Sequence, residues 1–181
     1  MKKTGNDFLE PSKQQMINLV ELYQAGKYVD TEKLALSMTQ EFPKHPFAWK
    51  VLAAVLKQNG KINESVNVSK KSVKLNPNDP EAHKNLGILL HEKGNLKEAE
   101  KSFKQAISLK PNYAEAYSNL GNILREQDKL KEAVESFKQA IKYEPNYAEA
   151  YNNFGNILRE QGKLKEAEAS YKKAIELKPN Y

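Results

Sequence analysis

A polar row recurs every 34 residues in the later part of the chain. It consists of Asn85, Asn119, Asn122, Asn153, Asn156, Arg125 and Arg159. Asn119, Asn122 and Arg125 follow one another at intervals of three, which keeps them near one face of a helix. An asparagine amide donates and accepts hydrogen bonds at once, so a row of amides can pair with the backbone of an extended polypeptide. We treat these seven residues as candidate peptide-binding residues.

Other kinds of site chemistry find no support in the sequence. There is no cysteine, which excludes thiolate nucleophiles, disulfides and Cys-based metal sites. The three histidines, His45, His83 and His91, are scattered, and no HExxH, GxSxG or GxxxxGK arrangement occurs. We therefore expect no catalytic residues, no metal and no cofactor, and the chain is predicted not to be an enzyme.

The row is one part of a longer repeat. Residues 114–147 and 148–181 differ at only 10 of 34 positions, and residues 80–113 continue the same frame. Two weaker copies, 46–79 and 12–45, precede them and keep a glycine near the middle and a proline near the end. The sequence therefore predicts five repeats of 34 residues after an N-terminal extension, residues 1–11.

Each repeat contains two helical patterns separated by a break. In residues 114–147, apolar or small side chains have helical spacing before and after the break at Asp128 and Lys129. The first set is Tyr117, Leu120, Gly121 and Leu124, and the second is Leu130, Ala133, Phe137, Ala140 and Ile141. The repeat is thus predicted to be an antiparallel helical hairpin. One hairpin buries too little to offset its entropy, so successive hairpins must stack.

These positions resemble the tetratricopeptide repeat. The resemblance rests on Tyr117, Leu120, Gly121, Leu124, Ala133, Phe137, Ala140 and Pro145, and on Tyr151, Phe154, Gly155, Leu158, Ala167, Tyr171, Ala174 and Pro179. It covers residues 12–181 and weakens toward the start, where Ser65, Ser69 and Ser72 replace the usual small and aromatic residues. It implies an all-α, right-handed α-solenoid whose first helices line a concave groove.

The resemblance also implies a function for the polar row. The strongest repeats are similar to those of related bacterial proteins and of O-linked N-acetylglucosamine transferases. In the transferases an asparagine ladder holds extended polypeptide. Asn85, Asn119 and Asn153 match the ladder positions, whereas Ile17 and Val51 interrupt it. The expected function is a protein interaction module with a scaffold or targeting role. The alternative is the substrate-presenting region of a larger enzyme, such as a glycosyltransferase of this type.

Charge and hydropathy indicate which class of partner and which location to expect. The net charge is +6, but lysines such as Lys131 and Lys165 alternate with Glu132 and Glu166, which disfavours nucleic acid as a partner. No apolar run is long enough to span a bilayer, and the N-terminus has no signal sequence, so we expect a cytoplasmic protein. The last repeat has no polar cap over its apolar side, Leu164, Ala167, Tyr171 and Ala174. We expect either that the chain is a fragment of a longer protein or that this side docks on another copy or on a partner.

Overall fold

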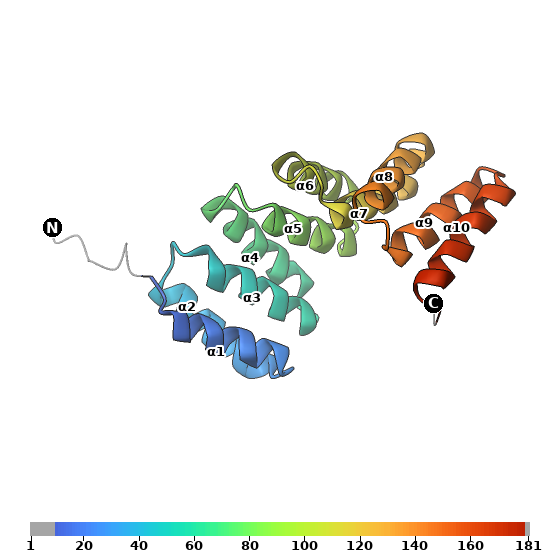
Figure 1. The fold of residues 1–181 in the computed structure, drawn as a ribbon. Coiled ribbons are helices and arrows are strands. Elements are labelled where there is room, and N and C mark those ends of the chain that lie inside the picture. Colours follow the sequence, from blue (N-terminus) through green and yellow to red (C-terminus); the bar gives the residue numbers. More distant parts are fainter. Residues whose placement is uncertain (1–9, 180–181) are drawn as a thin grey trace. The chain divides into compact units, whose positions relative to one another are not determined.

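The computed structural model describes residues 10–179, and every regular element in that range is an α-helix (Figure 1). The helices are α1 (Lys13–Gln24), α2 (Tyr28–Glu41), α3 (Pro46–Gln58), α4 (Ile62–Leu75), α5 (Pro80–Glu92), α6 (Leu96–Leu109), α7 (Ala114–Glu126), α8 (Leu130–Tyr143), α9 (Ala148–Glu160) and α10 (Leu164–Leu177). They form five consecutive pairs, so the predicted all-α fold of helix-turn-helix repeats is confirmed. Most of the predicted extension, residues 1–9, and the last two residues of the fifth repeat lie outside the described residues.

The chain forms two compact parts, residues 1–93 and residues 94–181. The first part contains α1 to α5, where each helix contacts the next and α1 also contacts α3. The second contains α6 to α10, with the same contacts between successive helices and between α7 and α9. The boundary falls in the turn between α5 and α6, so the compact parts do not coincide with the sequence period.

The turns after α1, α3, α7 and α9 share one geometry. After α9, the amide of Gly162 donates to the carbonyl of Arg159, and the amide of Lys163 donates to that of Leu158. These two bonds define the Schellman motif, which requires a left-handed residue after the helix. Gly162 has φ +74°, whereas Asp128 occupies the equivalent position after α7 with φ 60°. The break predicted at Asp128 is therefore a left-handed turn.

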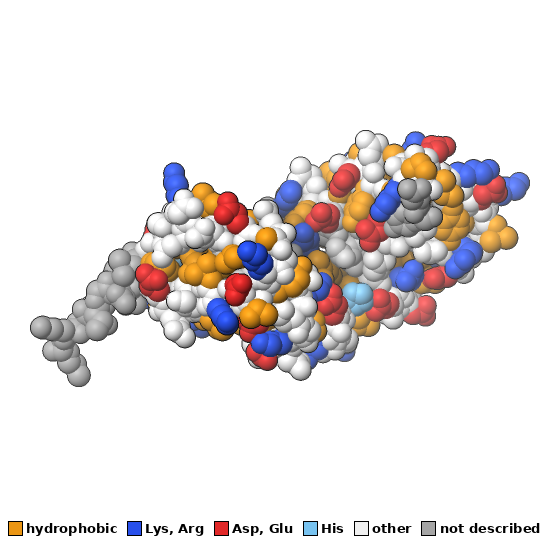
Figure 2. All heavy atoms as spheres, turned by 90° about the horizontal axis from the view of Figure 1, so that it is seen from below, with side chains coloured by type: hydrophobic (Ala, Val, Ile, Leu, Met, Phe, Trp, Pro, Cys, Tyr) orange, Lys and Arg blue, Asp and Glu red, His pale blue; other side chains and the backbone are white. Residues whose placement is uncertain are grey.

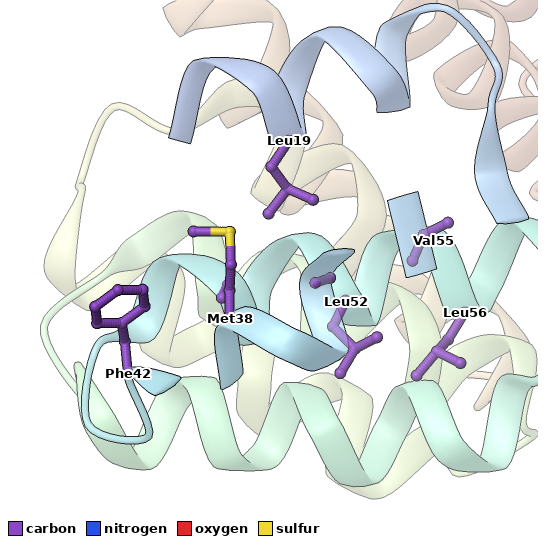
Figure 3. Close-up of a cluster of buried hydrophobic side chains, with 8 residues drawn as sticks. Leu19, Met38, Phe42, Leu52, Val55 and Leu56 are labelled. Atoms are coloured by element: carbon purple, nitrogen blue, oxygen red, sulfur yellow. The ribbon is translucent and has the colours of Figure 1, made fainter. Parts of the chain in front are cut away.

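The core of the first part joins successive repeats (Figure 3). It consists of the buried residues Leu19, Ala35, Met38, Phe42, Ala48, Leu52, Val55 and Leu56. These residues come from α1, from α2 and its C-cap, and from α3, so the first helix of the second repeat helps to close the first hairpin. This is the nearest-neighbour stacking on which a helical repeat protein depends.

In the second part the two helices of a hairpin approach closely at a glycine. A Cβ added at Gly121 on α7 would lie 2.8 Å from Cε1 and Cζ of Phe137 on α8. One added at Gly155 on α9 would lie 2.6 Å from Cε1 of Tyr171 on α10. In each hairpin the aromatic ring of the second helix thus occupies the space that a side chain on the first helix would need.

The apolar side of the last hairpin is smaller than the sequence suggests. Ala167 and Ala174 are buried, and Tyr171 is half-buried. The large apolar side chains exposed on α10 are Leu164 and Ile175, which are 66% and 54% exposed. The prediction that both alanines belong to an open face is wrong, because they pack inside their own hairpin.

Glu100 on α6 forms ion pairs with Lys104 on the same helix and with Lys129 at the start of α8. Lys104 Nζ donates to one of its carboxylate oxygens at 2.6 Å, and Lys129 Nζ donates to the other at 2.9 Å. The hydrogen bond from Lys104, opposed by burial and reinforced by Lys129, lowers the pKa of Glu100 to about 2. The carboxylate side chain is only 14% exposed, so solvent screens this pair of contacts less than those of a fully exposed ion pair.

The two glycine contacts predict unequal effects of adding a methyl group. Gly121→Ala is expected to lower the free energy of unfolding by about 1 to 3 kcal/mol, because Phe137 is fully buried and has nowhere to move. Gly155→Ala should cost less, since the half-buried ring of Tyr171 can shift outward. Urea unfolding followed by circular dichroism measures both, and equal losses would contradict the packing described here.

The lowered pKa of Glu100 predicts a pH-dependent contribution to stability. A carboxylate whose folded pKa is depressed stabilises the fold above its unfolded pKa of about 4.3, and this contribution disappears as the pH falls toward 2. Glu100→Gln should therefore lower stability at pH 7 but not near pH 2. Glu135→Gln is the matched control, because Glu135 is 65% exposed and pairs only within its helix with Lys138. Urea unfolding from pH 2 to 7 would refute the assignment if both variants behaved alike.

Candidate peptide-binding surface

One face of the first part is hollowed where α1, α3 and α5 meet. A cavity of about 260 Å³ is lined by Val20, Tyr23, Gln24, Lys50, Val51, Ala54, Glu81 and Asn85. Because these helices are the first helices of the first three repeats, the cavity runs across three successive repeats. We call this surface the inner groove. Asn85, the first residue of the predicted polar row, lies in it and is half-buried.

A second cavity of about 230 Å³ adjoins the inner groove and continues between α3, α4 and α5. The two cavities share Tyr23, Lys50, Ala54 and Asn85. The second one alone reaches α4, where Ser69 and Ser72 are buried in its wall. The inner groove therefore has a deep extension in the second repeat.

The charges beside the groove are paired. Lys50 Nζ lies 3.0 Å from Asp79 Oδ2 and 3.2 Å from Glu81 Oε2. Burial opposes the charged form of Lys50, but the hydrogen bonds to Asp79 and Glu81 outweigh it, and its pKa is raised. Lys57, which also lines the deep cavity, pairs with Glu92. The surface therefore offers hydrogen-bonding groups and apolar walls with its charges largely neutralised.

The polar row of the second part lies on α7 and α9, which contact one another. Asn119 and Asn122 on α7 and Asn153 and Asn156 on α9 are all half-buried. Arg125 is half-buried as well, whereas Arg159 is exposed. These six residues thus lie on first helices, as the sequence predicts.

Two of these amides already have partners within the protein. Asn119 Nδ2 donates to the carbonyl of Glu115 one turn earlier at 2.8 Å. Asn156 Oδ1 accepts from the hydroxyl of Tyr171 on α10 at 2.8 Å. Each still has other hydrogen-bonding capacity, because an amide has two N–H donors and an oxygen with two lone pairs. Asn119 is held in place by its own helix, and Asn156 by the second helix of its hairpin.

The predicted residues are divided between the two compact parts. Asn119, Asn122, Asn153 and Asn156 share the second part, whereas Asn85 belongs to the first. The alignment of Asn85 with the others in one continuous ladder stays a prediction. The sequence analysis did not predict Tyr23 and Lys50 as site residues. The signal that could have led to them is Ser69, which stands where the later repeats have an aromatic residue.

Residues 10–179 contain no group of three or more histidine or acidic side chains that could hold a metal ion. Within the same range, no helix is long and apolar enough to cross a membrane.

Family models match most of the chain. A model described as TPR repeat matches residues 54–94, 89–126 and 121–158, and one described as Tetratricopeptide repeat matches residues 148–181. Comparison with curated protein sequences gave no match.

Solved structures with the same fold include three proteins of low sequence identity to this chain. A crystal structure of MamA has a TM-score of 0.81 at 22% identity, covering 95% of this chain and 98% of that one. YrrB, described as a TPR protein with an unusual peptide-binding site, gives 0.76 at 18% identity, covering 94% and 88%. The Pseudomonas aeruginosa pilF structure gives 0.83 at 17% identity, covering 90% and 74%. The predicted solenoid fold of five helical hairpins is confirmed.

From the repeats that the family models match, and from the paired helices that the structure shows, the chain belongs to the tetratricopeptide repeat family.

Proposed function

We propose that this protein is a non-catalytic interaction module that holds an extended segment of a partner polypeptide along the first helices of its repeats. Its role would be that of a scaffold or a targeting subunit. The observation that carries this proposal is the inner groove, in which a half-buried asparagine amide, Asn85, lies among apolar and neutralised charged side chains on three successive first helices.

The spacing of the asparagines is compatible with an extended chain. Packed helices lie about 8 to 10 Å apart and an extended backbone advances about 3.3 Å per residue, so each repeat would meet the peptide about every third residue. The likeness of this row to the ladder of O-linked N-acetylglucosamine transferases stays a prediction from the sequence. YrrB, whose structure has the same fold, is described as having a peptide-binding site, and this supports the same class of ligand here.

The asparagines alone would bind weakly. Three amides making two bonds each would contribute about 3 to 9 kcal/mol, because a net hydrogen bond is worth about 0.5 to 1.5 kcal/mol. Association itself costs at least about 4 kcal/mol. A partner must therefore gain further affinity from side-chain contacts or from being tethered nearby.

The surface charge favours a polypeptide over a nucleic acid. Figure 2 shows basic and acidic side chains intermixed on the face that it presents, without a continuous basic stripe. Several lysines are paired with carboxylates, among them Lys50, Lys61 and Lys129. Phosphate binding would require such lysines to give up their partners.

We further propose a cytoplasmic location, and self-association through Leu164 and Ile175 as a secondary property.

Replacing the three ladder asparagines tests the proposal. The variant Asn85→Ala, Asn119→Ala, Asn153→Ala should bind an extended peptide pool at least roughly tenfold more weakly, because each lost bond removes about 0.5 to 1.5 kcal/mol. The measurement is titration by isothermal calorimetry or fluorescence anisotropy.

The matched control replaces three exposed asparagines outside the row, Asn63, Asn67 and Asn112, by alanine. This control should leave peptide affinity unchanged. Equal affinity of the ladder variant and the unmodified protein would show that the amides do not contact the peptide. Comparing Asn85→Ala with Asn119→Ala, Asn153→Ala would show which compact part contributes.

A further inference from the structure

The eighth and twenty-fourth residues of each repeat determine how its hairpin is filled. In the fourth and fifth repeats these are Gly121 with Phe137 and Gly155 with Tyr171, where a large ring packs on a glycine. In the first repeat the sizes are reversed: Leu19 and Ala35 lie in the same buried cluster. A small residue on one helix is thus matched by a large one on the other.

The second repeat breaks this rule, because both of its residues are small. Ala53 and Ser69 hold the two positions, and both are buried, at 5% and 3% exposure. Neither position carries a ring like that of Phe137 in the fourth repeat. The deep cavity of about 230 Å³ lies at this place and is lined by both residues.

Hydrogen bonds keep α3 and α4 in position around the cavity. Ser65 Oγ donates to the carbonyl of Ala53 at 2.6 Å, and Ser72 Oγ donates to that of Pro46 at 3.4 Å. Two serines of α4 therefore bond to the backbone of α3. The short bond from Ser65 opposes the collapse that would otherwise close the space left by a missing side chain.

The cavity has a buried floor and an open mouth. Ala53, Ser69, Ser72, Ala82 and Leu89 are buried. At the mouth, Tyr23, Lys50 and Asn85 are half-buried and belong to the inner groove as well. A chain lying in the groove would therefore have direct access to the cavity.

We propose that this cavity is a side-chain pocket that accepts a phenylalanine side chain of the polypeptide held in the inner groove. The inference rests on the proposed function and adds the specificity that the asparagines lack. A cavity of about 150 Å³ in another protein holds benzene, so about 230 Å³ is enough for a phenyl ring. The two lysines that line the cavity, Lys50 and Lys57, are paired with Asp79, Glu81 and Glu92, which favours a neutral side chain over a charged one.

Asn85 connects the pocket to backbone recognition. Its amide lines both cavities, so it can bond to the peptide backbone beside the residue whose side chain enters the pocket. The pocket would thereby set the register of the bound chain in the groove.

The test compares two capped peptides on the full chain by NMR titration. One is acetyl-Thr-Ser-Thr-Phe-Thr-Ser-Thr-amide, and the other has alanine in place of phenylalanine. We expect the phenylalanine peptide to bind roughly 10- to 100-fold more tightly, the effect of burying a large apolar side chain. The amide signals of Ala53 and Ser69 should shift only with that peptide.

Filling the pocket from within should remove this preference. The double variant Ala53→Gly, Ser69→Phe installs the pair found in the fourth repeat and should bind both peptides equally while melting at a higher temperature. Ser69→Val fills less of the cavity, introduces no ring, and should reduce the preference even if the double variant fails to fold. Asn63→Ala, Asn67→Ala, Asn112→Ala is the control, because these exposed asparagines lie outside the groove and the cavity, so the affinities of both peptides and their ratio should stay unchanged.

The outcomes separate this inference from the proposed function. Equal binding of the two peptides to the unmodified protein would refute the phenylalanine pocket but would not contradict peptide binding in the inner groove. A preference that survives in a folded double variant would also overturn the pocket. Failure of both peptides to bind would overturn the groove, and the pocket with it.

Discussion

Two helices of a hairpin approach one another only as closely as the side chains between them allow. In the fourth and fifth repeats that limit is set by one pair of positions, where Phe137 packs on Gly121 and Tyr171 on Gly155. The pair fixes the spacing of the hairpin, and the stacking of hairpins then places the first helices side by side. The inner groove exists because this arrangement is repeated.

The same constraint separates the two kinds of recognition that the groove can offer. Amides such as Asn85 and Asn119 pair with a backbone and are indifferent to sequence. Where the packing pair is incomplete, at Ala53 and Ser69, the groove gains a cavity that responds to side-chain size. General affinity and selectivity thus come from different residues. Affinity comes from side chains on the surface of the first helices, and selectivity comes from the cavity between α3 and α4.

Much of the fold could be predicted from the sequence, because helical periodicity and the 34-residue period are local signals. The hairpin breaks, the stacking and the placement of the asparagines on first helices all follow from them. Burial on α10 could not be predicted in this way, since Ala167 and Ala174 are apolar at helical spacing whether they face a neighbour or their own hairpin. The cavity could not be predicted either, because it forms only when residues 53 and 69, which are 16 positions apart, are both small. Nor does any local pattern mark the division into two compact parts at residue 93.

Proteins built from near-identical tandem copies risk pairing a helix with the wrong partner while they fold. The different residue pairs in this chain reduce that risk. Leu19 opposite a ring such as Phe137 would overfill the contact, and Gly121 opposite Ala35 would leave it empty, so exchanged hairpins are penalised by volume alone. The reversed pair of the first repeat therefore disfavours exchange of its helices with those of the fourth and fifth repeats, whose pairs are alike.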